Sequence, residues 1–499
     1  MKKNKFYITT PLYYVNAAPH IGHSYTTTAA DVLSRFYRRE LGEKNVWFLT
    51  GTDEHGQKIQ KAADAKGMTP QAFSDETVGH FKNLWKDLNI SYNYFIRTTD
   101  KAHVEFVQKV LQIVFEKGDI YQDEYEGLYC TPCEAFWTKK QSPDNLCPDC
   151  KRPVELIKEK NYFFKLSKYQ DWLVDYIKNH PDFIKPEFRR NEVLSFLNLN
   201  KLDDLCISRP KERLSWGIPL PFSPDHVTYV WFDALINYIS AIGEFDAEGK
   251  YKSNWWPADM QLIGKDILRQ HAVYWPIMLK ALDIEPPKTI FAHGWWMIDQ
   301  AKMSKSLGNV VNPIEMVAKY GIDTYRYFLL RDVPFGLDGN FSEEAIIKRF
   351  NGDLANDLGN LVYRTLTMIE KYYQGKIPEG EAKNEKAKLI REKIKILHEE
   401  VAIRLTVNYD FSAALEKIWE LIGMANKYVE ETKPWNLAKE NKTEELKSFI
   451  RLLVDVIRKV AEELTPFMPD TAKAINEQFG DKEIKKGNPL FPRIDLKKP

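Results

Sequence analysis

Two pairs of side chains in this sequence of 499 residues are suited to chemistry at phosphate. His20 and His23 lie one helical turn apart, where an apolar strand at residues 6–10 is followed by a helical pattern. Lys302 and Lys305 lie in a short polar segment far along the chain. Imidazoles at a helix start can donate hydrogen bonds to a phosphoryl group, and lysines on a loop can meet the charge of a departing pyrophosphate. We therefore predict that these four residues are catalytic.

Each pair is a weak signal when it is taken alone. A histidine pair at a helix start is more often a cap and a core residue, and lysines on a loop are usually solvated. Gly22 lies between the histidines and would let a flat purine ring approach the backbone. The chain has no G-x-G-x-x-G motif, so a dinucleotide-binding fold is not supported. Together and in this order, the two pairs favour an ATP site.

The pattern around the histidines predicts a parallel βαβ unit. After the first strand, apolar residues repeat at helical spacing at Tyr25, Ala29, Val32, Leu33 and Phe36. A second strand is expected at residues 46–49 and is expected to end at Gly51. Later apolar runs predict further strands at residues 229–232, 260–264 and 289–292. The sheet must then be split by the segment that lies between the early and the late strands.

We predict an α/β fold, a Rossmann-like parallel sheet split by a zinc-bearing insertion and followed by an all-α helical bundle. The bundle is indicated by helical apolar spacing after about residue 345, where strand signals disappear. The predicted parts are a first catalytic half at 1–116, a connective insertion at 117–225, a second catalytic half at 226–300, a segment with the lysine loop at 301–345, the bundle at 346–475 and a tail at 476–499.

Four of the five cysteines form two C-x-x-C pairs within residues 130–150. Cys130 and Cys133 are followed, after 13 residues, by Cys147 and Cys150. Four thiolates at this spacing suit one tetrahedral structural zinc, with no open position for catalysis. A reduced loop without metal is the alternative. Cys206 stands outside the pairs and is expected to be buried.

Bulk composition fits a globular protein inside the cell. Hydrophobic residues make up 44% and charged residues 28% of the chain. The 71 basic and 70 acidic residues leave a formal charge of +1, so contact with nucleic acid must come from local patches. No run reaches the roughly 18 apolar residues of a membrane span, and the N-terminus lacks a secretory signal. We expect a cytoplasmic protein, and paired cysteines agree with a reduced compartment.

The histidine and lysine motifs resemble the signatures of class I aminoacyl-tRNA synthetases, and the surrounding sequence is most similar to the methionyl-tRNA synthetases. The similarity rests on residues 10–16, 51–56, 229–234, 263–267 with His271, and 293–295. It extends from about residue 5 to about residue 495. The resemblance implies that methionine is activated with ATP and Mg²⁺, with release of pyrophosphate, and is then transferred to the 3′ end of methionine tRNA.

The resemblance also implies binding roles for single residues. Around methionine it places a mostly aromatic and apolar set, which suits a long side chain with a polarizable sulfur: Leu12, Tyr14, Trp231, Ala234, Leu235, Tyr238, Ile267 and His271. It places Asp53 at the α-ammonium group, with Arg209 in support. For ATP binding we select Gly22, Gly264, Asp266, His293 and Gly294. Core packing is the alternative for any single aromatic residue, at better than even odds.

The helical region carries candidates for reading tRNA. Asn360 and Arg364 share a helix face, and Trp435 lies at a predicted helix start. The family uses matching residues to recognise the CAU anticodon, and exposed Trp and Arg side chains suit unpaired bases. Packing within the bundle is the alternative role for Trp435.

Two further expectations concern tRNA. Lys158, Lys160, Lys165 and Lys168 flank the cysteine pairs and are candidates for holding the acceptor end, although a solvated basic face is at least as well supported. Family members often continue into an extra tRNA-binding module beyond the point where this chain stops. We therefore expect either an enzyme that works without this module or a separate tRNA-binding subunit.

Two other interpretations stay open on the sequence alone. A cysteinyl-type synthetase would probe its substrate with a metal beside the pocket, but the cysteines here lie far in sequence from Trp231. A catalytically silent tRNA-binding protein of the same fold would have no chemical need for the histidine and lysine pairs. Exchange of pyrophosphate into ATP with single amino acids separates all three interpretations.

Overall fold

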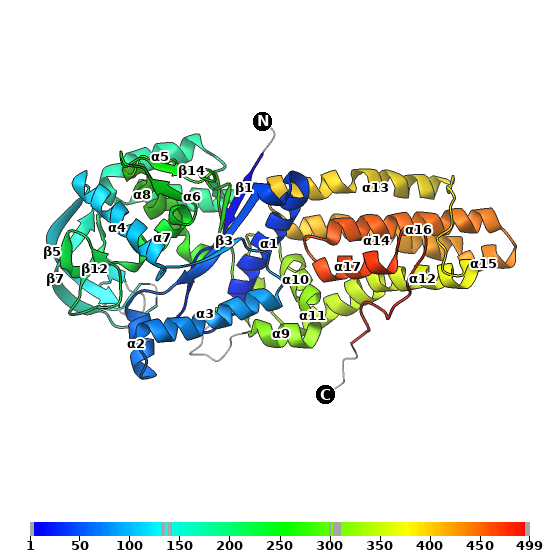
Figure 1. Ribbon diagram of the computed structural model, residues 1–499, viewed down its shortest axis with the longest axis horizontal. Helices are drawn as coiled ribbons and strands as arrows, with labels where there is room; N and C mark the ends of the chain where they lie inside the picture. Colours follow the sequence, from blue (N-terminus) through cyan, green and yellow to red (C-terminus); the bar gives the residue numbers. More distant parts are fainter. Residues whose placement is uncertain are drawn as a thin grey trace. The chain divides into compact units, whose positions relative to one another are not determined.

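The main sheet is parallel, as the βαβ pattern predicts (Figure 1). The computed structural model of the protein describes residues 4–130, 135–137, 139, 142–148, 150–298, 301–302 and 311–494. Within these residues the sheet has seven strands in the order β2–β3–β1–β15–β16–β8, with β4 beside β3. The strands are β1 (Phe6–Thr9), β2 (Tyr13–Tyr14), β3 (Val46–Asp53), β4 (Tyr94–Arg97), β8 (Ile184–Lys185), β15 (Met260–Gly264) and β16 (Ile290–His293). All of these pairings are parallel, so the carboxyl ends of the strands lie at one edge of the sheet, where parallel sheets bind ligands.

The first helix and the second strand differ in how well their ends were predicted. Helix α1 (Ile21–Leu41) buries all five of the apolar residues that repeat at helical spacing. Strand β3 does not end at Gly51 but continues to Asp53. A Cβ atom at Gly51 would collide with the carbonyl oxygen of Ile96 on β4. This glycine therefore permits a close approach of two strands and does not terminate one.

The predicted strand at residues 229–232 is wrong. Tyr229 caps helix α7 (Val230–Ser240), in which nine residues are buried. A helix that is buried on nearly all sides shows a continuous apolar run, and a short run of this kind has no period that distinguishes a helix from a strand. The helix places Trp231, Ala234 and Tyr238 at the i, i+3 and i+7 positions of one face.

The insertion folds into antiparallel sheets of its own and also contributes to the main sheet. One sheet has the strand order β6–β5–β7–β9 and another the order β10–β12–β11. These strands are β5 (Ile120–Cys130), β6 (Ala135–Trp137), β7 (Glu155–Phe164), β9 (Leu205–Cys206), β10 (Ser208–Pro210), β11 (Pro219–Leu220) and β12 (Ser223–Thr228). Strand β8 lies within the predicted insertion but pairs with β16. The insertion thus also supplies an edge strand of the catalytic sheet.

Contacts divide the chain into two compact units, with the later boundary between His293 and Gly294. The second unit holds the helical bundle, which includes α12 (Asn360–Tyr373), α13 (Glu385–Ile403), α14 (Phe411–Thr432), α15 (Pro434–Lys439), α16 (Thr443–Leu464) and α17 (Pro469–Gln478). Helices α13, α14 and α16 pack against one another (Figure 1). The predicted apolar stripe of α16 is buried from Leu446 to Leu464. The predicted fold class is thereby confirmed.

The described part of the predicted tail is attached to the bundle. Asn351 exchanges two hydrogen bonds with the backbone of Ile494, at 2.8 and 2.9 Å. Lys486 pairs with Glu370 of α12 at 2.6 Å. These contacts attach the segment to α12, which carries Asn360 and Arg364, and to the π-helical segment Phe350–Gly359 that precedes α12.

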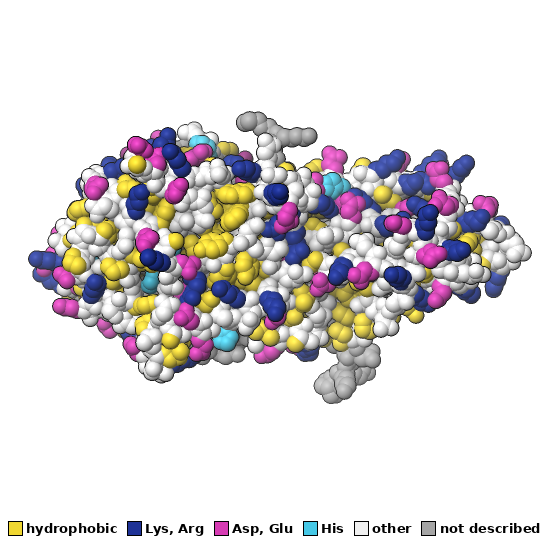
Figure 2. Space-filling model, viewed as in Figure 1, with side chains coloured by type: hydrophobic (Ala, Val, Ile, Leu, Met, Phe, Trp, Pro, Cys, Tyr) yellow, Lys and Arg dark blue, Asp and Glu magenta, His cyan; other side chains and the backbone are white. Residues whose placement is uncertain are grey.

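The surface mixes charges of both signs. On the face drawn in Figure 2, basic and acidic side chains are interspersed, in agreement with a formal charge of +1. Among the described helices, none combines the length and the apolar character that crossing a membrane requires.

Candidate active site and cysteine cluster

The histidine pair forms a reciprocal cap at the start of α1. The backbone N–H of Gly22 donates to Nδ1 of His20 at 3.1 Å, and the backbone N–H of His20 donates to Nδ1 of His23 at 3.1 Å. The two rings are stacked with centroids 3.8 Å apart. Because both Nδ1 atoms accept a hydrogen bond, each neutral ring carries its proton on Nε2. Local backbone geometry thus turns both histidines into donors at their distal nitrogen.

Aromatic packing holds His23 from the other side. The ring of Tyr13 meets it edge-on at 4.9 Å, and the ring of Phe81 lies at 5.4 Å. A Cβ atom at Gly22 would lie 3.0 Å from Cε1 of His20. Glycine at this position therefore keeps the His20 ring in its capping position, a role that the sequence did not suggest.

Three of the predicted ATP-binding residues lie at the carboxyl ends of adjacent strands. Gly264 of β15 and His293 of β16 are register partners. Nε2 of His293 lies 2.6 Å from the Thr26 hydroxyl, which also bonds to the carbonyl oxygen of Gly22 at 3.1 Å. Asp266 is exposed in the short helix η3 (Lys265–Ile267) that follows β15. The structure thus connects the start of α1 with the ends of β15 and β16.

Gly294 opens the second unit. There a Cβ atom would collide with the backbone of Leu337, so close packing alone requires glycine at this position. Its predicted contact with ATP stays a prediction.

Tyr238 and His271 form a buried hydrogen-bonded pair. The Tyr238 hydroxyl lies 2.7 Å from Nε2 of His271, and Nδ1 of His271 lies 2.9 Å from the carbonyl oxygen of Ile267. A carbonyl only accepts, so Nδ1 carries the proton and Nε2 accepts from the tyrosine. Burial lowers the pKa of His271 to about 4. The pair is therefore neutral at physiological pH and suits an apolar ligand.

The other predicted methionine contacts fall into two groups. Trp231 meets the His271 ring edge-on at 6.4 Å, and Ala234 and Leu235 are buried on the same helix, α7. Tyr14 and Asp53 are register partners at the ends of β2 and β3, and Leu12 precedes them as a partly buried residue. The first group and the Tyr238–His271 pair share α7 and the segment after β15. The second group lies at the strand ends where Asp53 is buried.

A buried polar chain beside this pocket was missed by the sequence analysis. Oδ2 of Asp233 lies 2.6 Å from Nδ1 of His55, and Oδ1 lies 2.8 Å from Nε2 of His103. Burial alone would raise the pKa of Asp233. The two histidines together lower it by more than burial raises it, so the pKa of Asp233 lies below its usual range. The chain joins the β3 end to α7. Its only sequence signal was a carboxylate within the apolar run of α7.

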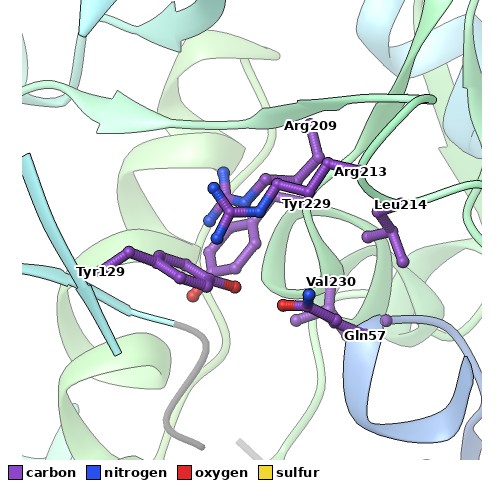
Figure 3. A pocket seen from close by; sticks show the side chains of 8 residues that line it. Gln57, Tyr129, Arg209, Arg213, Leu214, Tyr229 and Val230 are labelled. Atoms are coloured by element: carbon purple, nitrogen blue, oxygen red, sulfur yellow. The ribbon is translucent and has the colours of Figure 1, made fainter. Parts of the chain in front are cut away.

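Arg209 is buried and lines a pocket (Figure 3). Its guanidinium donates to the carbonyl oxygen of Ser208 at 2.6 Å and lies 4.7 Å from the ring centre of Tyr229. The resemblance places Arg209 in support of the methionine site. Tyr229 is the cap of α7, so Arg209 packs against the helix that carries Trp231.

Three of the four predicted zinc ligands lie together. The Sγ atoms of Cys130, Cys147 and Cys150 are all within 4.8 Å of one another, and those of Cys130 and Cys150 are 3.5 Å apart. Sulfurs on one tetrahedral zinc are separated by about 3.8 Å, because each Zn–S bond is about 2.3 Å. Three thiols at this spacing fit the ion. Cys133 lies outside the described residues. Cys206 was expected to be buried, but the structure shows it partly exposed.

The lysine loop is only partly described. The backbone of Lys302 lies in β18 (Ala301–Lys302), which pairs with β17 (Trp296–Ile298). Lys305 lies outside the described residues. The catalytic roles of both lysines stay predictions.

The tRNA candidates differ in their surroundings. Trp435 is 43% exposed at the start of α15, and Asn360 is exposed at the start of α12. Helices α12 and α15 both pack against α16. The exposure of Trp435 disfavours a role as a packed bundle residue.

Three of the basic side chains flanking the cysteines have structural partners. Lys158 pairs with Glu124 at 3.5 Å, Lys165 donates to the carbonyl oxygen of Gly118 at 2.7 Å, and Lys168 pairs with Asp119 at 2.6 Å. Their predicted contact with the acceptor end stays open.

Comparison with known proteins defines the class first. A family model described as "tRNA synthetases class I (M)" matches residues 6–155 and 151–366, and one described as "Anticodon binding domain of methionyl tRNA ligase" matches residues 377–490. The sheet, the histidine cap and the bundle are therefore those of a class I tRNA synthetase.

Similar proteins identify the family. The methionine–tRNA ligase of Clostridium acetobutylicum is 50% identical over all of this chain and 79% of its own length, and that of Thermotoga maritima is 46% identical over 99% and 81%. A structure of Mycobacterium tuberculosis methionyl-tRNA synthetase in complex with methionyl-adenylate matches with a TM-score of 0.92 and 40% identity, over 98% of this chain and all of that one. The chain belongs to the methionine–tRNA ligase family.

Membership of the family decides the open alternatives. The protein activates L-methionine with ATP and transfers it to methionine tRNA. The cysteinyl-type and the catalytically silent interpretations are excluded. The expected separate tRNA-binding subunit is not supported, because the chain carries its own anticodon-binding domain.

Proposed function

We propose that methionine activation in this protein depends on the reciprocal histidine cap at the start of α1. The methionine carboxylate attacks the α-phosphorus of ATP, pyrophosphate leaves, and methionyl-adenylate forms. The Nε2–H groups of His20 and His23 donate to phosphoryl oxygens as charge builds up in the transition state. The observation that carries the proposal is that each Nδ1 accepts a backbone N–H at 3.1 Å, which leaves the proton on Nε2.

The remaining ATP contacts come from the strand ends and the lysine loop. Gly22, Gly264, Asp266, His293 and Gly294 hold the nucleotide, with the exposed Asp266 carboxylate available to the ribose hydroxyls. Lys302 and Lys305 meet the leaving pyrophosphate. Mg²⁺ bound to ATP would neutralise part of the phosphate charge. The support is the connection from α1 to β16 through Thr26 and His293.

Methionine selection follows from a neutral and largely apolar pocket. Tyr238 and His271 offer the sulfur weak polar contacts and no charge, while Trp231, Ala234, Leu235 and Ile267 surround the chain. Leu12 and Tyr14 close the site, and Asp53 pairs with the α-ammonium group. The buried Asp233 bridge positions α7 against the end of β3.

We further propose one structural zinc on Cys130, Cys133, Cys147 and Cys150. When bound, the ion supplies folding energy to the insertion and no chemistry at phosphate. Free thiols this close together are typical of proteins in a reducing compartment, which supports the proposed cytoplasmic location. In the bundle, Asn360, Arg364 and Trp435 read the anticodon, as the exposure of Trp435 supports.

Substitution of His20 by asparagine and by alanine tests the role of the cap. Asparagine keeps an acceptor for the helix N-terminus but lacks the distal donor. His20→Asn should therefore fold like the wild type and should lose about 10²–10³ in the rate of pyrophosphate exchange, the usual effect of removing one such donor. His20→Ala should lose the same rate and in addition about 1 kcal/mol of stability. A His20→Asn variant with the exchange rate of the wild type would show that Nε2 has no part in the reaction.

A further inference from the structure

Asp233 connects three separate elements of the first compact unit. It lies on α7 and is fully buried. Its carboxylate lies 2.6 Å from Nδ1 of His55, which follows the end of β3, and 2.8 Å from Nε2 of His103, on α4 (Lys101–Glu116). An ionised carboxylate only accepts hydrogen bonds, so both imidazoles donate to it. One side chain thus joins a strand end and two helices.

His103 contacts α7 at two points. Besides its bond to Asp233, its Nδ1 lies 2.8 Å from the hydroxyl of Ser240, the last residue of α7. Residues 233 and 240 are seven positions apart and therefore share one face of the helix. Because Nε2 donates to Asp233, Nδ1 of the neutral ring accepts from the serine. Helix α4 thereby holds α7 along nearly two turns of this face.

The segment that follows β3 is held from other sides as well. Glu54 is fully buried, and Arg97 at the end of β4 donates two hydrogen bonds to its carboxylate, both at 2.7 Å. The backbone N–H of Gly56 donates to the carbonyl oxygen of Trp216 at 3.2 Å. The Trp216 ring lies 5.3 Å from the ring of His55. The bond from His55 therefore ties α7 to a fixed point.

The two ends of the proposed methionine site depend on this connection. Asp53, the proposed partner of the α-ammonium group, lies two residues before His55. Ala234, which is proposed to contact the side chain, directly follows Asp233, and Tyr238 lies on the same helix. The separation between the end of β3 and α7 therefore sets the distance from the ammonium group to the side-chain pocket.

We propose that Asp233 is a positioning residue that determines which length of amino acid side chain the enzyme accepts. Its two hydrogen bonds keep α7 at the separation from β3 at which methionine fits and a longer side chain does not. This separation is stiff, because moving α7 would leave a buried carboxylate without its donors. The inference rests on the proposed function, which locates methionine between Asp53 and α7.

Pyrophosphate exchange with methionine and with ethionine, which is longer by one methylene group, tests the proposal. The selectivity is the ratio of kcat/KM for the two amino acids, and the concentration of active enzyme cancels in this ratio. The wild type should prefer methionine about 10–200-fold, the usual effect of one methylene group in an apolar pocket. A residue that only stabilises the fold would change the amount of active enzyme and leave the ratio unchanged.

Three variants probe the connection. Asp233→Ala removes both bonds, and His55→Phe removes the bond to the β3 segment but keeps a ring beside Trp216. Each should lower the preference for methionine at least about fivefold, because α7 can then move away from β3. Asp233→Asn keeps the size of the side chain and one acceptor oxygen, and it should retain more of the preference than Asp233→Ala. His55→Phe leaves the carboxylate in place and gives the decisive ratio even where Asp233→Ala does not fold.

Asp119 in the insertion provides a matched control. Its buried carboxylate accepts from Lys168 and from the Tyr169 hydroxyl, both at 2.6 Å. Asp119→Ala should keep the preference of the wild type. A preference unchanged within about twofold in His55→Phe, or an equal loss in Asp119→Ala, would overturn the proposal.

The proposed function fails by a different result. A defect in the phosphate chemistry affects both amino acids alike and cancels in the ratio, whereas the exchange rate of His20→Asn reports on the histidine cap. Absence of exchange with methionine in the wild type would count against the proposed function. Exchange by the wild type without a preference for methionine over ethionine would overturn the role of Asp233.

Discussion

Methionine binding should not weaken when the pH falls from about 7.5 to about 5.5. Among the described residues assigned to the methionine site, His271 is the only histidine, and an ordinary histidine has a pKa of about 6.5. In this structure burial lowers the pKa of His271 to about 4. The group therefore stays neutral, and its Nε2 continues to accept from the Tyr238 hydroxyl at 2.7 Å.

The two pKa values predict different affinities. If only the neutral pocket binds methionine, the dissociation constant rises in proportion to one plus the ratio of protonated to neutral His271. Between about pH 7.5 and about pH 5.5 it would rise about tenfold with a pKa of about 6.5, and it rises by about 3% with a pKa of about 4. Equilibrium dialysis with labelled methionine distinguishes these values. A tenfold loss of affinity with a midpoint near pH 6.5 would refute the neutral pocket.

A hydroxyl deletion tests the same hydrogen bond. Tyr238→Phe leaves Nε2 of His271 buried without its donor, which costs about 1–3 kcal/mol and should weaken methionine binding roughly five- to 150-fold. The matched control is Tyr251→Phe, which removes a hydroxyl that donates to the carbonyl oxygen of Ile239 at 2.9 Å outside the pocket. The control should keep the affinity of the wild type. Equal affinities in the two variants would show that the pair does not shape the pocket.

Three further predictions concern other parts of the molecule. Lys305→Ala should leave methionine affinity unchanged and slow adenylate formation about 10²–10³-fold, because the lysine meets charge that appears mainly in the transition state. Weaker methionine binding with an unchanged rate of adenylate formation would contradict this role of Lys305. Metal analysis of protein purified without chelator should find one zinc per chain, and its removal should harm tRNA charging more than exchange, whereas metal-free protein would contradict the cysteine site. Trp435→Ala should spare exchange and reduce aminoacylation by at least the about 1–3 kcal/mol of one stacked base, with equal defects in both assays as the contrary result.

The catalytic centre could be predicted where chemistry and local pattern agree. The histidine pair combines a helical spacing with side chains that can cap a helix, so its location at the start of α1 follows from neighbours in the sequence. Its role at phosphate stays a prediction. The cysteine spacing is equally local. The structure brings the Sγ atoms of Cys130 and Cys150 to 3.5 Å, although 20 positions separate the two residues in the sequence.

What could not be predicted depends on distant parts of the chain. The Asp233 bridge joins residues that are 130 and 178 positions apart, and no periodicity reports such a contact. The start of helix α7 was predicted as a strand because the helix is buried on nearly every side, so its apolar residues show no helical period. Strand β8 lies within the insertion but completes the catalytic sheet, because its partner β16 follows about 100 residues later. Tertiary contacts decided these three features.

Pyrophosphate exchange with single amino acids is the most direct test of the central claim, that a histidine cap and a neutral aromatic pocket activate methionine. The purified chain is incubated with ATP, Mg²⁺, labelled pyrophosphate and one amino acid at a time, without tRNA. Methionine and close analogues should support exchange, and cysteine, isoleucine, leucine and valine should support almost none. Full exchange with cysteine and none with methionine would contradict the account.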